Sequence, residues 1–283
     1  MEIQFIKMQG LGNDYVYVDT EVQDLRGTDE TALARAVSAR HFSVGADGLI
    51  VIDRCPEADV AMRMYNADGS RGEVCGNGLR CVAKYCRDAG IVPDDRVQIL
   101  TDAGVRRARV LTATPRAAVV EVEMGRVERI PERIPVVGGN NRIQLTAGDR
   151  SFYLYACSVG NPHAVTFLDS LDIDVERYGR MIGSDRVFPA GANVSFVRPL
   201  RVGTLQARVW ERGSGETLAC GSGACAVTVA AIEEGYAEYG MPVRVILPGG
   251  VVTVTVQETG EVTQRGEAVT VARGVFLLSL IHI

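Results

Sequence analysis

Apolar residues fall mostly in short runs rich in Val, Ile and aromatic residues, a pattern typical of β-strands. Seven such runs occupy the first half of the chain: residues 4–8, 15–19, 49–52, 61–65, 97–100, 105–111 and 118–122. Helical spacing is rarer and predicts two helices there, one over residues 29–41 and one from about residue 79 to residue 89, before Gly90. The pattern therefore predicts an α+β protein with more strand than helix.

An internal duplication is the most informative feature of the sequence. The segment Cys-Gly-Asn-Gly at residues 75–78 matches Cys-Gly-Ser-Gly at residues 220–223, an offset of 145 residues. Three further matches keep the same order at offsets of 146 to 148: residues 40–46 with 186–192, 97–104 with 243–250, and 12–13 with 160–161. Four matches at nearly one offset indicate two copies of one domain.

The duplication also predicts where the two domains join. Residues 125–148 contain two prolines and a Gly-Gly-Asn-Asn run, a composition suited to a linker. We expect residues 1–118 with 270–283 to form one domain and residues 119–269 to form the other. Two like domains often pack about a pseudo-twofold axis, which would set Cys75 and Cys220 against each other across an interdomain cleft.

Each of these two cysteines precedes a Gly-x-Gly segment near the predicted start of a helix. Glycines let backbone N–H groups approach a ligand closely, and a helix N-terminus attracts anions and lowers the pKa of a thiol. Two opposed thiols beside a carboxylate suit one reaction class. One thiolate removes a proton from the carbon next to the carboxylate, and the other thiol returns a proton to the opposite face, so the stereocentre is inverted.

Other interpretations of the cysteines have less support. Four of the seven lie among apolar residues and fit buried structural positions: Cys81, Cys86, Cys157 and Cys225. The spacings are not Cys-x-x-Cys and the chain has three histidines, which argues against a zinc site. A redox dithiol usually places its two cysteines close in sequence, although a Cys75–Cys220 disulfide under oxidation stays open.

Cofactor motifs are also lacking in the sequence. There is no Gly-x-Gly-x-x-Gly segment and no phosphate-loop lysine motif. The two lysines, Lys7 and Lys84, lie in segments without a constellation suited to pyridoxal phosphate. We therefore expect neither a cofactor nor a metal.

Composition narrows the class of protein further. Of the 283 residues, 47% are hydrophobic and 23% charged, as in globular proteins, and the net charge is −5 with no long basic run, which argues against a nucleic-acid partner or an anionic membrane surface. The longest apolar stretches are far shorter than the ~18 residues needed to span a bilayer, and the first residues lack a signal-peptide pattern. An odd number of cysteines in a well-cored chain indicates a reducing, cytoplasmic location.

Five motifs along the chain resemble those of diaminopimelate epimerases. They are residues 7–14 (KMQGLGND), 66–70 (NADGS), 75–78 (CGNG), 160–163 (GNPH) and 211–223 (ERGSGETLACGSG), in the family's order. The resemblance implies cofactor-independent interconversion of LL- and meso-2,6-diaminopimelate, a step in lysine and peptidoglycan precursor biosynthesis. It also implies two similar domains, each a mixed or antiparallel sheet wrapped around a central helix, that close over the substrate.

Matching positions carry the family's roles onto this chain. The resemblance makes Cys75 the base for the LL substrate and Cys220 the base for the meso substrate. The amides that would hold the reacting carboxylate are those of Gly76, Asn77, Gly221 and Ser222. The residues that would grip the distal amino-acid end are Asn13, Asn66, Asn161, Asn193, Glu211 and Arg212. His163 would tune the charge of one thiol.

One position departs from the family's pattern, and the composition of the chain end is unusual. Gly48 stands where some members carry glutamine, so this chain lacks that side-chain contact. Residues 277–283 are unusually apolar for a chain end, so the last few residues are expected to be poorly ordered or foreign to the natural chain.

Three other functions remain open at this point. A racemase of proline or hydroxyproline is disfavoured by the asparagine-rich set and the Glu211-Arg212 pair, because proline has no distal polar end. A non-catalytic relative of the same fold would not need both cysteines, and a redox-regulated thiol protein is the third alternative. We expect diaminopimelate as the small-molecule partner, and a homodimer is a possible assembly.

Overall fold

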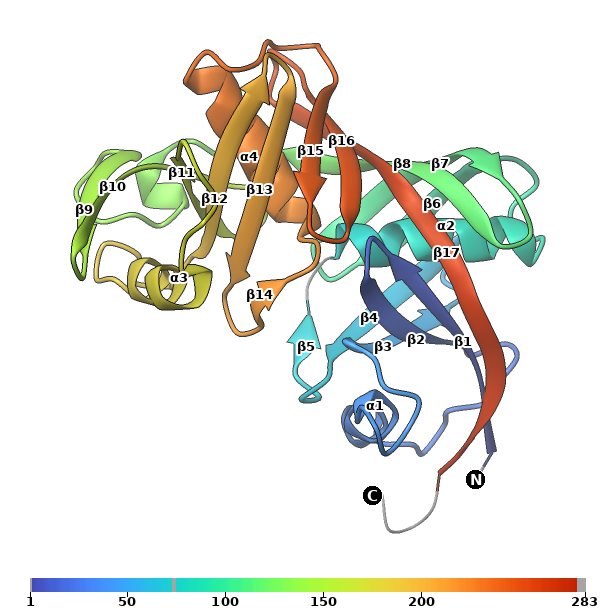
Figure 1. The fold of residues 1–283 in the computed structure, drawn as a ribbon. Coiled ribbons are helices and arrows are strands. Elements are labelled where there is room, and N and C mark those ends of the chain that lie inside the picture. Colours follow the sequence, from blue (N-terminus) through green and yellow to red (C-terminus); the bar gives the residue numbers. More distant parts are fainter. Residues whose placement is uncertain (1, 73–74, 279–283) are drawn as a thin grey trace. The chain divides into compact units, whose positions relative to one another are not determined.

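The chain divides into two compact units, Met1–Val122 with Gly266–Ile283 and Glu123–Arg265 (Figure 1). This computed structural model describes residues 2–72 and 75–278. The expectation about the apolar chain end therefore falls partly outside the described residues, at 279–283. Among the described residues, no helix is long and apolar enough to cross a bilayer.

The first unit combines a mixed sheet with two helices. In chain order its elements are β1 (Glu2–Gly10), β2 (Asn13–Asp19), α1 (Glu30–Ser38), β3 (Gly48–Asp53), β4 (Val60–Asn66), β5 (Arg71–Gly72), α2 (Gly76–Asp88), β6 (Arg96–Thr101), β7 (Gly104–Ala113) and β8 (Ala117–Arg126). The strands pair in the order β1–β2–β3–β4–β6–β7–β8, and β5 adds to β4. The β2–β3 and β4–β6 pairs are parallel, and the others are antiparallel.

The second unit repeats this arrangement. Its elements are η1 (Pro131–Arg133), β9 (Arg142–Ala147), β10 (Arg150–Ser158), β11 (Pro162–Phe167), α3 (Val175–Gly183), β12 (Asn193–Arg201), β13 (Thr204–Glu211), β14 (Gly215–Thr217), α4 (Gly221–Glu233), β15 (Val243–Leu247), β16 (Gly250–Val256) and β17 (Glu261–Leu277). The pairing order β10–β11–β12–β13–β15–β16–β17 again has parallel second and fourth pairs. The predicted duplication and the α+β class are confirmed.

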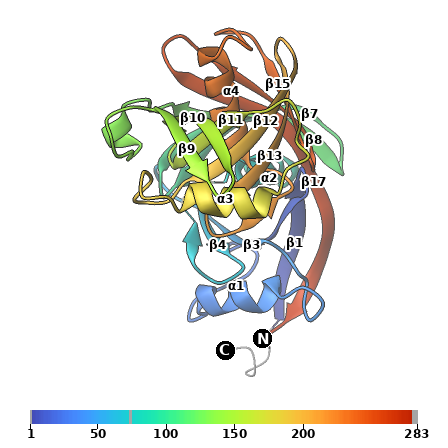
Figure 2. The same cartoon turned by 60° about the vertical axis from the view of Figure 1, so that its left-hand side comes forward.

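One helix of each unit lies against one face of the sheet and the other helix against the opposite face. In the second unit, a Cβ on Gly223 of α4 would contact Val209, whereas a Cβ on Gly179 of α3 would contact the next residue, Trp210. Adjacent residues of a strand point to opposite faces, so α3 and α4 lie against opposite faces of β13; Figure 2 shows these three elements. The segment of α4 is apolar on all sides, which is typical of a fully buried helix, and most of its residues are buried.

The predicted helix boundaries need two corrections. The first helix ends at Ser38 instead of residue 41, because Ala39 has a ψ of 103°, outside the helical region, and His41 then adopts a left-handed φ of 72°. The second begins at Gly76 instead of residue 79. Glycine is a poor helix former, and the two glycines of this first turn concealed its helical character in the sequence.

The expected linker and boundaries also differ from what is observed. Ile134 and Val136 are buried in the apolar core of the second unit, so the segment after Pro131 is part of that domain. The units divide after Val122 and after Arg265, inside β8 and β17, whereas we expected divisions at 118/119 and 269/270. A strand that continues through a boundary gives no turn signal in the sequence, which explains the difference.

Gly48 occupies a position where this backbone admits no side chain. It pairs with Asn66 on one side and Tyr15 on the other. A Cβ there would lie 2.0 Å from the carbonyl oxygen of Tyr65 and 2.9 Å from the Tyr15 ring. A glutamine at this position, as the family resemblance suggests for some members, would therefore clash with β4.

Candidate functional site

Cys75 is the N-cap residue of α2. Its backbone is extended, with φ −125° and ψ 114°, and its Sγ accepts a hydrogen bond from the Gly78 N–H at 3.3 Å. A Cβ on Gly78 would lie 2.8 Å from Ile50 and 3.7 Å from the Cys75 Sγ. Glycine at this position therefore lets the helix begin close beneath the sulfur atom.

Cys220 has the same geometry in the second unit. It caps α4 with φ −112° and ψ 113°, and its Sγ accepts from the Gly223 N–H at 3.3 Å. Gly221 at the first position of α4 packs closely on Gln264, whose Nε2 would lie 2.9 Å from an added Cβ. The duplicated sequence thus produces two thiols in one local conformation.

The first turn of α2 and the first turn of α4 each have features suited to binding an anion. The N–H groups at the start of a helix have no intrahelical acceptor, and the helix dipole adds partial positive charge there. The residues concerned are the four named from the sequence: Gly76, Asn77, Gly221 and Ser222. The Ser222 Oγ also lies 3.6 Å from the Cys220 Sγ.

Asn13 and Asn77 lie beside Cys75. The Cys75 thiol donates to the Asn13 Oδ1 at 3.3 Å, and the Asn77 Nδ2 donates to the same oxygen at 3.1 Å. Asn66, at the end of β4, donates from Nδ2 to the Ser70 Oγ at 3.0 Å. The structure thus brings Asn13 and Asn77 into contact with Cys75 and holds Asn66 in a neighbouring turn.

Glu211 is the charged residue that affects the pKa of the Cys220 thiol. Burial raises the pKa of the Cys220 thiol well above its usual value, and the charge of Glu211 and a hydrogen bond between the two raise it further. The Thr217 hydroxyl donates to Glu211 Oε1 at 2.5 Å and holds the carboxylate in place. No pattern in the sequence indicated this contact with the thiol, and the expected contact of Glu211 with the distal end of the substrate stays a prediction.

The remaining predicted residues of the second unit form a polar cluster. His163 and Asn193 are neighbours in the parallel β11–β12 pair, and the His163 Nε2 lies 2.9 Å from Asn161 Oδ1. Asn193 Oδ1 accepts from the Arg212 backbone N–H at 2.8 Å, while its Nδ2 donates to the Pro162 carbonyl at 3.1 Å. These contacts fix the orientation of the Asn193 amide and bring Arg212 next to it.

His163 is an uncharged member of this cluster. It is fully buried, and burial, assisted by the charge of Arg212, lowers its pKa to about 3. At neutral pH the imidazole therefore acts through hydrogen bonds instead of carrying a positive charge. Its Nδ1 is buried without a hydrogen-bond partner among the described residues.

Three residues that contact the candidate site were not predicted: Asp47, Arg80 and Thr217. Asp47 accepts from the Asn13 Nδ2 at 2.8 Å, and Arg80 donates to the Asn77 Oδ1 at 2.6 Å. Arg80 follows Asn77 by one helical turn, so its spacing was a usable signal once α2 is known to begin at Gly76. Asp47 is 34 residues from Asn13, and no pattern in the sequence links the two.

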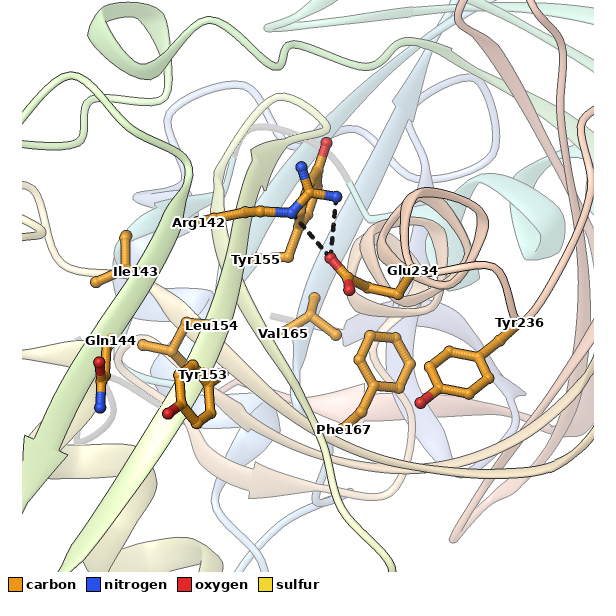
Figure 3. Close-up of a pocket in the computed structure, with 10 residues that line it drawn as sticks. All are labelled: Arg142, Ile143, Gln144, Tyr153, Leu154, Tyr155, Val165, Phe167, Glu234 and Tyr236. Atoms are coloured by element: carbon orange, nitrogen blue, oxygen red, sulfur yellow. Dashed lines mark hydrogen bonds and ion pairs between the residues drawn. The ribbon is translucent and has the colours of Figure 1, made fainter.

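A separate cavity of about 400 Å³ lies in the second unit beside β9, β10 and the end of α4 (Figure 3). Arg142 and Glu234 form an ion pair at 3.1 Å on one side, and the rings of Phe167 and Tyr236 lie 4.9 Å apart on another. None of the predicted site residues lines it. The candidate chemistry is therefore located at the two helix N-termini.

Known proteins are similar to this chain over nearly its whole length. The family model described as diaminopimelate epimerase matches residues 5–130 and 155–271. A diaminopimelate epimerase of Desulfovibrio desulfuricans is 42% identical over 98% of this chain and 99% of that protein. The chain belongs to the diaminopimelate epimerase family. Another epimerase of this name, from Methanococcus maripaludis, is 39% identical over 96% of the chain and 99% of its own length. The protein is therefore an isomerase.

Solved structures outside the close family share its fold. A hydroxyproline epimerase from Agrobacterium vitis superposes with a TM-score of 0.70 at 16% identity, covering 99% of this chain and 93% of that one. A phenazine biosynthesis protein of the PhzF family from Bacillus anthracis gives a TM-score of 0.68 at 18% identity, with 98% and 100% coverage. At such low identity these matches show the two-domain fold alone, and they give no support to the proline or hydroxyproline alternative.

Proposed function

We propose that Cys75 and Cys220 are the two acid–base groups with which this epimerase interconverts LL- and meso-2,6-diaminopimelate. The observation that carries the proposal is that each thiol caps the N-terminus of a buried helix in the same conformation. Family membership supplies the substrate and reaction, and the duplicated cap supplies two chemically similar groups. Such a pair suits a reaction whose substrate and product are near mirror images at the reacting carbon.

The reaction breaks one C–H bond and forms another at the same carbon. The Cys75 thiolate takes the α-hydrogen of the LL isomer as a proton, and the electron pair delocalises into the adjacent carboxylate. The backbone N–H groups of Gly76, Asn77, Gly221 and Ser222 would stabilise the charge that develops there. The Cys220 thiol then gives its proton to the opposite face, which yields the meso isomer and a Cys220 thiolate.

The environment of Cys220 supports its role as the acid in this direction. Its raised pKa keeps it protonated when the substrate arrives. In the reverse direction Cys220 must lose its proton first, and Glu211 is the acceptor within hydrogen-bond contact. The contact with Glu211 therefore serves both directions of the reaction.

The distal end of diaminopimelate carries an ammonium and a carboxylate. We propose that Arg212 binds the distal carboxylate and that the amide oxygens of Asn66, Asn161 and Asn193 bind the distal ammonium. The contacts of Asn193 with Arg212 and Pro162 support this role, because they orient polar groups before substrate binds. A site that satisfies these groups discriminates against amino acids that lack them.

Isotope incorporation tests the function. When LL-diaminopimelate is epimerised in D₂O, the meso product should carry one solvent deuterium at the inverted α-carbon, because the donating thiol exchanges with solvent. Mass spectrometry and NMR measure this incorporation, and L-proline and trans-4-hydroxy-L-proline serve as comparison substrates. Inversion without deuterium, or faster turnover of either comparison substrate, would contradict the proposal.

We further propose a cytoplasmic homodimer. No cysteine among the described residues is in a disulfide, as in a reducing compartment. Val275 and Leu277 lie on one face of β17, and both are more than half exposed, as is Val271 at the bulge of this strand. An apolar strand face of this kind suits contact with a second copy. Light scattering should give about twice the chain mass of 30.5 kDa, and cell fractionation should place the protein in the cytoplasm.

A further inference from the structure

Four polar side chains form a continuous chain of hydrogen bonds beside Cys75. The Arg80 Nη2 donates to the Asn77 Oδ1 at 2.6 Å, and the Asn77 Nδ2 donates to the Asn13 Oδ1 at 3.1 Å. The Asn13 Nδ2 donates to the Asp47 Oδ2 at 2.8 Å. One end of the chain is thus a guanidinium, the other end is a carboxylate, and two neutral amides lie between.

The charged ends determine how both amides point. A guanidinium has no acceptor, so Arg80 can face only the oxygen of Asn77. A carboxylate has no donor, so Asp47 can face only the NH₂ group of Asn13. With both ends fixed in this way, Asn13 must present its oxygen to the Cys75 thiol, from which it accepts at 3.3 Å.

We propose that Asp47 is a positioning residue that holds the Asn13 oxygen toward Cys75, so that Asn13 stabilises the protonated form of the Cys75 thiol, the form that donates a proton when the meso isomer is converted. The proposal rests on the proposed acid–base role of Cys75. An amide oxygen accepts from a thiol but repels a thiolate, whereas a flipped amide would donate to the thiolate. Asp47 therefore adjusts the protonation of Cys75 through the orientation of a neutral residue.

Asp47 is itself held by several contacts. Its Oδ1 accepts from the Arg40 Nη2 at 3.0 Å, and its Oδ2 also accepts from the Asp14 N–H at 3.1 Å. The Asp14 carboxylate lies 2.6 Å from Arg40 and 2.9 Å from the Lys7 Nζ. The two carboxylates are therefore neutralised by two cations. This network holds the Asp47 carboxylate in position.

Two other titratable groups among the described residues lie near Cys75. Tyr17 and Cys81 both interact electrostatically with Cys75. Burial raises the pKa of Tyr17 well above its usual value and that of Cys81 to about 11, so both are neutral at physiological pH. The N–H of Gly78 favours the thiolate, and the Asn13 oxygen opposes it.

The substitution Asp47→Asn tests the proposal without substrate. An asparagine at position 47 has one oxygen, which cannot face Asn13 and Arg40 at once, so the Asn13 amide gains freedom to flip. The rate of iodoacetamide alkylation at Cys75 is followed against pH on the tryptic peptide 72–80, separately from every other cysteine. We expect the midpoint to fall by roughly one pH unit, a tenfold change in the thiolate-to-thiol ratio.

A double-mutant cycle separates orientation from simple loss of charge. An Asn13→Ala variant has no amide at position 13 for Asp47 to orient. In this background Asp47→Asn should therefore shift the midpoint far less. An equal shift in both backgrounds would overturn the proposal, since it would show that Asp47 acts through its charge alone. No shift in either background would overturn it as well. Asp24→Asn, which removes an exposed carboxylate of the same unit, is the matched control and should leave the midpoint unchanged.

Two further variants guard against a folding defect. Asp47→Glu keeps an acceptor without a donor and should restore the parental midpoint, which a merely structural role does not require. If Asp47→Asn fails to fold, Asp47→Ser carries the same prediction. The alkylation assay needs no turnover, so it separates the two proposals. If the parental protein lacks epimerase activity but Asp47→Asn still shifts the midpoint, the proposed function is refuted and the role of Asp47 stands. If the parental protein is active but Asp47→Asn causes no shift, the role of Asp47 is refuted.

Discussion

Replacing Cys75 or Cys220 by alanine is expected to reduce kcat/KM for epimerisation by at least ~10³-fold, because each variant lacks one of the two groups that exchange protons with the α-carbon. The remaining thiol can still remove and return a proton on its own face. Residual deuterium exchange should therefore be confined to one isomer, the LL isomer in Cys220→Ala and the meso isomer in Cys75→Ala. Chiral separation and mass spectrometry of diaminopimelate measure both quantities.

The control for this experiment is Cys55→Ala. Cys55 is partly exposed and its thiol donates to the Ala58 carbonyl at 3.5 Å, so its removal should leave turnover within about twofold. Retained inversion in either of the other two variants would defeat the two-base mechanism. Exchange of both isomers by a single-thiol variant would show that one cysteine serves both faces.

Glu211→Gln is expected to have the second largest effect, a loss of roughly 10²-fold in kcat, because the variant lacks the group that accepts the Cys220 proton. It should also lower the pKa of Cys220. The sign follows from the causes: burial raises this pKa most, and the charge and hydrogen bond of Glu211 add to it. Removing the charge leaves burial in place, so the value should fall but stay above that of an exposed thiol. Alkylation of Cys220 against pH measures the shift.

Glu216→Gln provides the matched control. Glu216 lies on the neighbouring strand β14, where it pairs with Arg208 at 2.7 Å. Its removal should alter neither turnover nor the titration of Cys220, since that ion pair is partly exposed and makes no contact with the thiol. Equal losses in the two variants would indicate that Glu211 supports only the local structure of β13 and β14.

The main features of the fold follow from patterns that repeat along the chain. Strand runs, the offset between Cys75 and Cys220, and the Gly-x-Gly segments are local in sequence, so the duplication and the two caps could be recognised without coordinates. The start of α2 could not, because Gly76 and Gly78 have poor helix propensity and the helix forms through its burial against the sheet.

The partners of the two thiols depend on contacts that no local pattern encodes. Asp47 reaches Asn13 because β2 and β3 pair in parallel, and Glu211 reaches Cys220 through the turn into β14. The two caps are alike in backbone but differ in these partners, a neutral amide at Cys75 and a carboxylate at Cys220. The duplication thus conserved the geometry of the caps, while the acid–base properties of each thiol are set by residues outside the two Cys-Gly-x-Gly segments.

A crystal structure with α-methyl-diaminopimelate, which has no α-hydrogen at the reacting carbon and cannot be deprotonated there, tests the central claim most directly. We predict that the sulfur atoms of Cys75 and Cys220 lie on opposite faces of that carbon, each within about 4 Å of it, with its carboxylate against the first turns of α2 and α4. Sulfur atoms on one face, or one sulfur outside the substrate cavity, would contradict the account.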